Sequence, residues 1–273
     1  NPFIIFLKGE TMLQGFIIAF SIYSKVPMPY IKQTNANRKY VTAFFPFVGL
    51  LISAFIGIWL YFAPIFHFSR LFISCIAVIL PFFITGNIHF NGFLYTIDAL
   101  SLKQEKVGKL KLLESHHQTI SSCIHASLYI LFSFCIWNEL YPFFVSNTEN
   151  DMIIICLLML IYIISRCLGG LSILTFPRAT ETGTVAALSH HAQLKSNKII
   201  LLLILFICCL IGFFLQPMLS PFFLASGVFF FFIFRLQAIK NFGGITDEIL
   251  GYFIQSCELI LLTVFLLGCK YFY

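Results

Sequence analysis

The stretch GNIHFNGFLYTIDAL, Gly86 to Leu100, places polar side chains directly after a charge-free apolar run. Asn91, Tyr95 and Asp98 stand at positions i, i+4 and i+7, which share one face of a helix over two turns. His89 lies near the start of the same stretch. Oxygen ligands at this spacing suit Mg²⁺, which binds carboxylates and substrate phosphates. Only Asp98 is a carboxylate, so a polar helix end remains the alternative to a metal site.

A second stretch, FGGITDEILGYFIQSCEL, begins at Phe242. Gly243 and Gly244 allow a tight turn and a close approach of the backbone to a ligand. Thr246 can cap the helix that follows, with Glu248 in its first turn. This pattern indicates either a binding turn or an ordinary glycine turn with a helix cap.

Two charged side chains fall inside apolar runs. Glu258 lies about two turns into the last run, at a depth where a carboxylate is costly and often functional. Arg166 lies towards the inner end of another run, where an arginine either snorkels to the interface or binds an anion such as phosphate. Arg178 lies nearer the interface, where contact with lipid headgroups is the simpler interpretation.

The composition shows what must position these side chains. The 273 residues are 59% hydrophobic and 10% charged, with a mean hydropathy of +0.94. Soluble domains carry about 25% charged residues. Because the apolar runs are continuous and do not alternate, we predict an all-α, polytopic integral membrane protein rather than a barrel. The expected surroundings are the lipid bilayer and small molecules, and nucleic acid is not an expected partner.

The apolar runs predict about seven transmembrane helices preceded by a short N-terminal hydrophobic segment. The short segment covers residues 12–24 and is suited to a re-entrant or interfacial position, because spanning needs about 20 residues. The predicted spans are 41–66, 71–86, 119–137, 152–175, 198–215, 217–234 and 249–269. No internal repeat or low-complexity linker is evident, so the simplest organisation is a single transmembrane domain over residues 1–273.

Loop charges predict the orientation of these spans. The segments 25–40, 87–118, 176–197 and 235–248 all carry Lys or Arg, whereas 138–151 and the turn 216–217 carry none. Counting spans places every basic loop on one face, with Arg70 as the exception. The positive-inside rule makes that face cytoplasmic.

Most of the acidic residues share the basic face. This group comprises Asp98, Glu105, Glu114, Glu181, Asp247 and Glu248. Carboxylates gathered beside basic loops favour a site for a charged cytosolic ligand, and solvated loop charge is the alternative.

Taken in order, several stretches resemble the cobalamin synthase family, adenosylcobinamide-GDP ribazoletransferase. They are SKVPMP, FFPFVGL, GNIHFNGFLYTIDAL, the Ser165–Arg166 pair with a later Pro-Arg, and FGGITDEILGYFIQSCEL. Together they run from about residue 16 to residue 262, nearly the whole chain.

The resemblance implies a multi-pass enzyme of the cell membrane that needs Mg²⁺. A hydroxyl of α-ribazole, or of its 5′-phosphate, would attack the cobinamide-linked phosphorus of adenosylcobinamide-GDP and release GMP. Such a reaction requires cations around a pyrophosphate. Homo-oligomers or other cobalamin-assembly proteins are further possible partners.

The resemblance also implies roles for particular residues. The expected catalytic residues are His89, Asp98, Arg166 and Glu248. The expected metal ligands are Asp98, Glu114, Asp247 and Glu248. The expected substrate-binding residues are Asn91, Arg178, Gly243, Gly244 and Thr246. The chain departs from the family pattern at Asn91, Tyr95 and Ser115, where the family places Asp.

Two alternatives remain open. The departures favour a catalytically degenerate relative, which would serve as a membrane scaffold or binding protein, and the second alternative is a transporter unrelated to cobamides. A transporter would show inverted repeats and midplane polar groups. No repeat is evident in the sequence, and the polar groups cluster at one interface, which disfavours the transporter.

Overall fold

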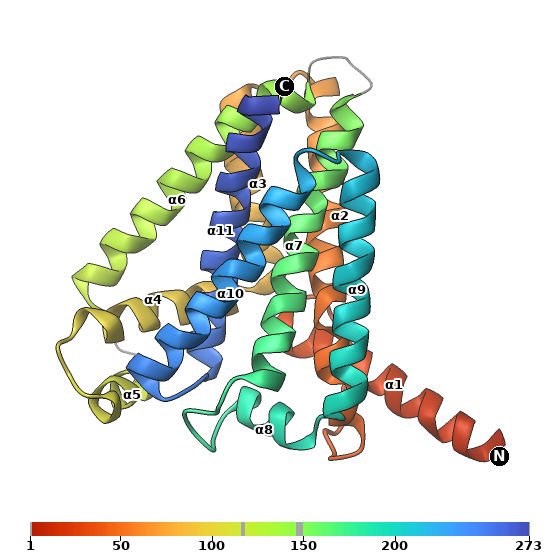
Figure 1. Ribbon diagram of the computed structural model, residues 1–273, viewed down its shortest axis with the longest axis vertical. Helices are drawn as coiled ribbons and strands as arrows, with labels where there is room; N and C mark the ends of the chain where they lie inside the picture. Colours follow the sequence, from red (N-terminus) through yellow and green to blue (C-terminus); the bar gives the residue numbers. More distant parts are fainter. Residues whose placement is uncertain (1, 116–117, 146–149, 273) are drawn as a thin grey trace.

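The computed structural model describes residues 2–115, 118–145 and 150–272, and these ranges fold into helices with one isolated bridge between loops (Figure 1). The elements are α1 (Pro2–Tyr23), η1 (Asn37–Phe44), α2 (Phe45–Ile65), α3 (Arg70–Thr85), α4 (Ile88–Ser101), α5 (Lys106–Ser115), α6 (Ile120–Leu140), η2 (Tyr141–Phe144), α7 (Asn150–Thr175), α8 (Thr184–His191), α9 (Leu194–Leu215), α10 (Ser220–Phe242) and α11 (Asp247–Phe272). The two η elements are 3₁₀ helices. The predicted all-α class is confirmed.

Six helical stretches in the described ranges are long and apolar enough to cross a membrane. They are Asn37–Ile65, Ile120–Phe144, Asp151–Thr175, Leu194–Leu215, Ser220–Phe242 and Asp247–Phe272. The pair α3–α4 makes a seventh if it is counted as one bent span. The apolar part of α1, Thr11–Tyr23, is shorter than a span. The predicted polytopic protein with about seven spans and a short first segment is therefore confirmed.

The segment 87–118, counted as a single loop in the charge analysis, contains the helices α4 and α5, so that assignment is wrong, whereas α4 agrees with the helical spacing of Asn91, Tyr95 and Asp98. The helix α3 ends at Thr85, and α4 starts at Ile88 after a bend of 95°. Gly86 and Asn87 between them both have positive φ, 62° and 64°, which a continuing helix cannot use. These two left-handed residues turn the chain into a second helix instead of releasing it as a loop.

The helix α4 runs across the bundle rather than along it (Figure 1). It packs against α11, α6 and α5. The preceding bend is itself packed, because the backbone N–H of Lys25 donates to the carbonyl of Ile84 at 2.8 Å. The side-chain stem of Lys25 covers Gly86 so closely that a Cβ there would lie 2.1 Å from Lys25 Cε. The loop after α1 therefore holds the bend in place.

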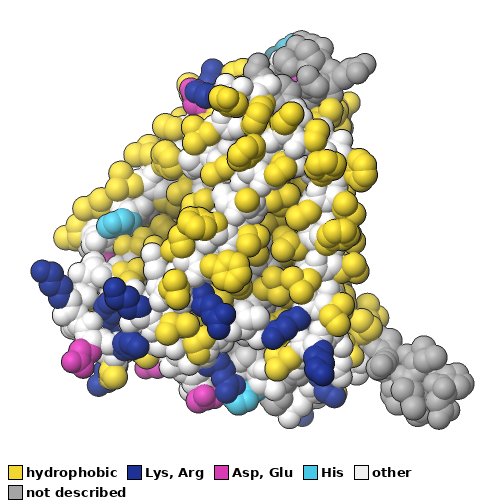
Figure 2. All heavy atoms as spheres, viewed as in Figure 1, with side chains coloured by type: hydrophobic (Ala, Val, Ile, Leu, Met, Phe, Trp, Pro, Cys, Tyr) yellow, Lys and Arg dark blue, Asp and Glu magenta, His cyan; other side chains and the backbone are white. Residues whose placement is uncertain are grey.

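Apolar side chains cover the flank of the molecule, and Lys and Arg gather mostly at the end that carries α4, α5 and α8 (Figure 2). We call this the basic end. The four segments predicted to be basic all reach it. At the far end Lys270 joins Arg70, and both lie beside Glu139. The helix α7 is the central element, with Leu157 and Ile161 fully buried.

Candidate functional site

Three segments far apart in sequence meet at the basic end: α4, the loop after α7, and the start of α11. The loop after α7 and the loop between α10 and α11 are joined by a parallel bridge between Arg178 and Ile245. In it the N–H of Ile245 donates to the carbonyl of Pro177 at 2.9 Å, and the N–H of Ala179 donates to that of Ile245 at 3.2 Å. The bridge fixes the turn from which α11 starts.

A close contact between two glycines brings α4 against α11. A Cβ on Gly251 would lie 2.6 Å from the carbonyl oxygen of His89, and one on Gly92 would lie 2.7 Å from that of Glu248. Both distances are too short for any side chain. The absence of side chains at these positions therefore lets the two backbones touch and places Asn91 beside Glu248.

The result is a pocket of about 210 Å³, here called the acidic pocket. Its polar lining consists of Asn91 and Tyr95 from α4 with Asp247 and Glu248 from α11. The pocket thus assembles two residues from the first sequence stretch and two from the second. The described lining contains two carboxylates and no cation.

The two carboxylates are held in different ways. Asp247 accepts hydrogen bonds from the backbone N–H groups of Thr184 and Val185, at 2.7 and 2.8 Å, and so caps the start of α8. Glu248 accepts one from the hydroxyl of Thr246 at 2.7 Å. Glu248 therefore keeps more of its hydrogen-bonding capacity for a ligand than Asp247 does.

The donor set fits a Mg²⁺ ion that keeps water and phosphate among its ligands. Such ions bind proteins through one or two carboxylates plus substrate phosphates. Glu248, Asp247 and the amide oxygen of Asn91 provide this set in one pocket. An all-protein cage does not fit, because the described residues include no group of three or more His, Cys, Asp or Glu side chains placed for a metal.

Asp98 does not line the acidic pocket in the structure. Its side chain is buried, and its two oxygens accept hydrogen bonds from the backbone N–H of Thr119, at 3.0 Å, and from the Thr119 hydroxyl. Thr119 is the N-cap residue of α6. Asp98 thus joins the end of α4 to the start of α6.

This geometry gives a testable distinction for Asp98. Asp98→Ala removes both hydrogen bonds to the exposed Thr119, each of which contributes about 0.5–1.5 kcal/mol of stability. Asp98→Asn keeps one acceptor oxygen. We expect Asn to restore most of the thermal stability and activity that Ala loses, measured by unfolding and product formation. Equal loss of activity in two stable variants would instead make Asp98 a metal ligand.

His89 is not part of the described lining of the acidic pocket. Its ring packs against Tyr23 and Phe45, with centroids 5.9 and 5.8 Å apart, and it is almost fully buried. Its Nε2 has no hydrogen-bond partner among the described atoms. The ring therefore packs under α4, and its carbonyl provides the contact with Gly251.

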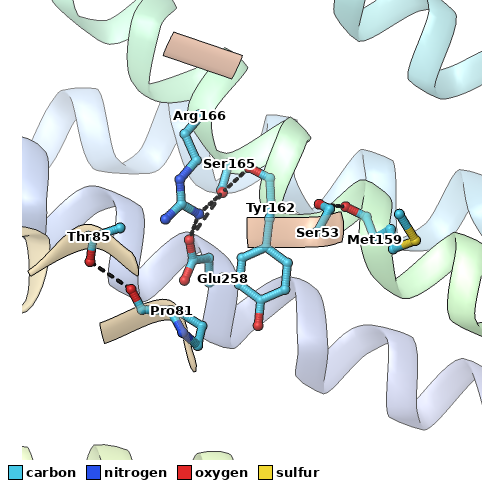
Figure 3. A network of polar contacts seen from close by, with 8 residues as sticks. All are labelled: Ser53, Pro81, Thr85, Met159, Tyr162, Ser165, Arg166 and Glu258. Carbon is cyan, nitrogen blue, oxygen red and sulfur yellow. Dashed lines mark hydrogen bonds and ion pairs between the residues drawn. The ribbon is translucent and has the colours of Figure 1, made fainter. Parts of the chain in front are cut away.

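Arg166 also lies away from the acidic pocket, inside the bundle (Figure 3). Its guanidinium forms an ion pair with Glu258 of α11, and both side chains are buried. The hydroxyl of Ser165 accepts from Arg166 at 2.9 Å and donates to Glu258 at 3.3 Å. The sequence drew attention to both charges but did not pair them. Two opposite charges in apolar spans were the signal that could have done so.

The remaining expected residues divide between the loops and α5. Arg178 is 29% exposed and lies 3.6 Å from Glu181. A hydrogen bond from His190, and then the charge of Arg178, lower the pKa of Glu181. Glu114 is exposed on α5, outside the described lining of the pocket.

The turn at Gly243 and Gly244 connects α10 to α11 and packs against the loop after α7. Gly244 packs on the carbonyl of Pro177, where a Cβ would lie 2.1 Å away, so no ligand can approach from that side. Gly243 ends α10 with φ 85°. Thr246 is buried, and its hydroxyl accepts from the N–H of Ile249 at 3.4 Å while it donates to Glu248.

Comparison with known proteins covers nearly the whole chain. A family model described as cobalamin-5-phosphate synthase matches residues 15–266. An adenosylcobinamide-GDP ribazoletransferase of Lachnoclostridium phytofermentans is 27% identical over 248 residues, covering 91% of both chains. One of Clostridium botulinum is 25% identical, covering 92% of this chain and 96% of its own. One of Clostridium perfringens is 27% identical, covering 88% and 92%. No solved structure gives a significant match.

Proposed function

The chain belongs to the cobalamin-5-phosphate synthase family, and from this we propose that it is an adenosylcobinamide-GDP ribazoletransferase. In the proposed reaction a hydroxyl of α-ribazole, or of α-ribazole 5′-phosphate, attacks the phosphorus that carries the cobinamide. A new P–O bond forms, the bond to the GMP phosphate breaks, and GMP leaves with the electron pair. The products are GMP and adenosylcobalamin or its 5′-phosphate.

The observation that carries the proposal is the acidic pocket. It combines Asn91, Asp247 and Glu248 at the basic end, where a nucleotide-linked substrate can arrive from water. We propose that these residues hold Mg²⁺, which when bound neutralises negative charge on the pyrophosphate. The proton of the attacking hydroxyl needs an acceptor, and the two carboxylates are the strongest described bases in the lining.

The orientation follows from the charge distribution. Lys and Arg gather at the basic end, and cytoplasmic loops carry such an excess. We therefore propose that the acidic pocket opens to the cytoplasm from the cell membrane. Arg178, in the bridged loop that adjoins the start of α11, is the cation proposed to meet a phosphate oxygen there.

The proposal is tested on the purified full chain in nanodiscs. It is incubated with adenosylcobinamide-GDP, α-ribazole 5′-phosphate and MgCl₂, and GMP and cobamide are measured by chromatography. We expect equal amounts of both products, and no product when EDTA replaces MgCl₂. GMP without cobamide would indicate hydrolysis and contradict the proposed transfer. Cobamide formation that continues in EDTA would contradict the metal.

A second candidate function is favoured by two residues in the acidic pocket. Asn91 and Tyr95 are neutral where family members are expected to carry Asp, which suits a relative that kept the frame as a scaffold. Ser115, the third such position, is exposed at the end of α5, outside the described lining of the pocket.

The variant Asn91→Asp separates the two functions. It adds a carboxylate to the pocket, and Mg²⁺ affinity follows ligand charge. We expect the Mg²⁺ concentration for half-maximal activity to fall several-fold, measured by a Mg²⁺ titration of initial rates. In a scaffold, the native chain would be inactive, and restoring Asp at positions 91, 95 and 115 would create activity.

A further inference from the structure

A groove on the other side of Asp247 has the opposite charge to the acidic pocket. It consists of two hollows of about 350 and 270 Å³ that share Gln33 and Arg38. The first hollow runs along α1 and includes Lys32, and the second reaches Thr184 at the start of α8. The described lining contains two cations and no carboxylate. We call it the basic groove.

Among the described side chains, no carboxylate forms an ion pair with Lys32 or Arg38. Arg38 donates through Nε and Nη2 to the side-chain oxygen of Gln33, at 3.2 and 2.9 Å. Because Gln33 is neutral, this contact orients the guanidinium without cancelling its charge. A guanidinium that is oriented and uncompensated is suited to a phosphate, which it can bind through two parallel hydrogen bonds.

The loop that presents these cations is fixed by one buried side chain. The amide of Asn37 donates to the carbonyl of Lys32 at 3.0 Å and to the side-chain oxygen of Gln14 at 3.2 Å. Its oxygen accepts from the backbone N–H of Thr34 at 2.7 Å. Asn37 is almost fully buried, so the turn is held from inside. The groove is therefore built before any ligand arrives.

The groove and the acidic pocket meet at Asp247. This carboxylate lines the acidic pocket, and it also accepts hydrogen bonds from Thr184 and Val185 at the start of α8. Thr184 itself lines the basic groove. The two cavities are thus separated by little more than one carboxylate and the backbone that it caps.

Part of the groove's wall is apolar and suits a flat aromatic base beside the polar side chains. Ile17 and Ile22 of α1 contribute from one side, and Leu188 of α8 contributes from the other. The hollows are near the lower limit of small-molecule pockets, about 300–1,000 Å³. An apolar wall with a cationic group at its edge matches a nucleoside that carries one phosphate.

We propose that the basic groove binds the phosphate ester of the acceptor, the phosphorylated nucleoside, while the acidic pocket takes the metal-bound pyrophosphate of the donor. This inference rests on the proposed function and assigns a separate subsite to the second substrate. The division follows from charge, since a phosphate is attracted by Arg38 directly but reaches two carboxylates only with a metal. An acceptor bound in the basic groove then extends its hydroxyl past Asp247 into the acidic pocket. There the hydroxyl reaches the cobinamide-linked phosphorus of the donor.

The test compares two acceptors on the same 273-residue chain in phosphatidylcholine nanodiscs. Arg38→Gln keeps a polar side chain and removes the charge. We expect it to raise KM for α-ribazole 5′-phosphate about tenfold or more, as the loss of a charge-assisted hydrogen bond implies. The KM values for unphosphorylated α-ribazole and for adenosylcobinamide-GDP should stay near those of the native chain.

Arg235→Gln is the matched control. Arg235 is exposed on α10 and lies over the ring of Phe176, outside the described lining of the groove. The Arg235→Gln substitution removes one positive charge. It should leave the ratio of the KM values for the two acceptors unchanged. An unchanged preference in Arg38→Gln would overturn the proposal. So would an equal loss of both acceptors, because that indicates a general defect.

Equilibrium binding separates this inference from the proposed function. Binding of α-ribazole 5′-phosphate without donor should weaken about tenfold in Arg38→Gln. If the native chain binds this ligand through Arg38 but forms no product, the transferase proposal fails and the subsite stands. If the native chain forms product and Arg38→Gln binds equally well, only the subsite fails.

A lipid headgroup offers the same phosphate chemistry, and a lipid arm distinguishes that source. Nanodiscs are prepared with and without phosphatidylglycerol, and bound lipid is measured by native mass spectrometry. We expect nucleotide binding through Arg38 in both preparations, with the same number of retained lipids in the native chain and in Arg38→Gln. Retained phosphatidylglycerol that is lost in Arg38→Gln and competes with the nucleotide would assign the groove to lipid instead.

Discussion

Glu248→Gln is expected to reduce cobamide formation by about 10²- to 10³-fold, the effect of removing one group that stabilises charge in a transition state. Glu248 is the pocket carboxylate with the fewest internal hydrogen bonds, since only the hydroxyl of Thr246 donates to it among the contacts described. Gln still offers an oxygen to that hydroxyl, so the start of α11 should keep its conformation. The variant therefore removes charge and little else.

The measurement is the rate of GMP release and cobamide formation across a Mg²⁺ titration. If Glu248 helps to hold the metal, raising Mg²⁺ should recover part of the lost rate. Glu105→Gln is the control, because Glu105 is an exposed carboxylate outside the described lining of the pocket. Full activity in Glu248→Gln at low Mg²⁺ would refute the assignment of the acidic pocket.

The second large effect is expected at the buried ion pair. Glu258→Ala leaves the Arg166 guanidinium buried without its partner, which costs about 3–5 kcal/mol. Without Glu258, the guanidinium keeps only the hydrogen bond to Ser165 among the described contacts. Its Nε and Nη2 have no hydrogen-bond partner among the described atoms. We expect the yield of folded Glu258→Ala to be well below that of the native chain. In nanodiscs or detergent, its unfolding midpoint should lie at a lower denaturant concentration.

A double variant tests the cause. In Arg166→Met with Glu258→Leu, both charges are replaced by apolar side chains of similar size. Replacing a buried pair in this way is often neutral or stabilising. We expect the double variant to unfold near the native midpoint, although each charge removed alone is destabilising. A double variant as unstable as Glu258→Ala would show that the packing shape matters, not the charge.

Much of the fold could be predicted from the sequence because the signals are local. Continuous apolar runs of the right length predict spanning helices, and the Lys and Arg in the loops predict that the loops share one end. The break at Gly86 and Asn87 was not predicted as a bend. After it, polar groups such as His89 and Asn91 interrupt the apolar pattern of α4, so the helix resembles a loop in hydropathy.

The candidate site was less predictable because its contacts join distant residues. The resemblance predicts Asp98 and Asp247 as metal ligands, and in the structure Asp98 accepts hydrogen bonds from Thr119 while Asp247 accepts them from the start of α8. The sequence alone does not distinguish an aspartate that caps a helix from one that binds a metal, because the difference lies in tertiary contacts. Arg38 and Gln33 were missed for a related reason, since a basic loop is expected on that face whether or not it forms a groove.

The bend between α3 and α4 has a consequence for the order in which the protein is made. The helix α4 has 14 residues and lies across the bundle, so it is synthesised early without a span of its own to complete. Its contact with α11, through Gly92 and Gly251, is available only after α11 has left the ribosome. The acidic pocket therefore forms after the spans α2 to α10 have been synthesised. A nascent chain that stops before α11 can insert those spans but has no acidic pocket, so activity requires that synthesis has passed α11.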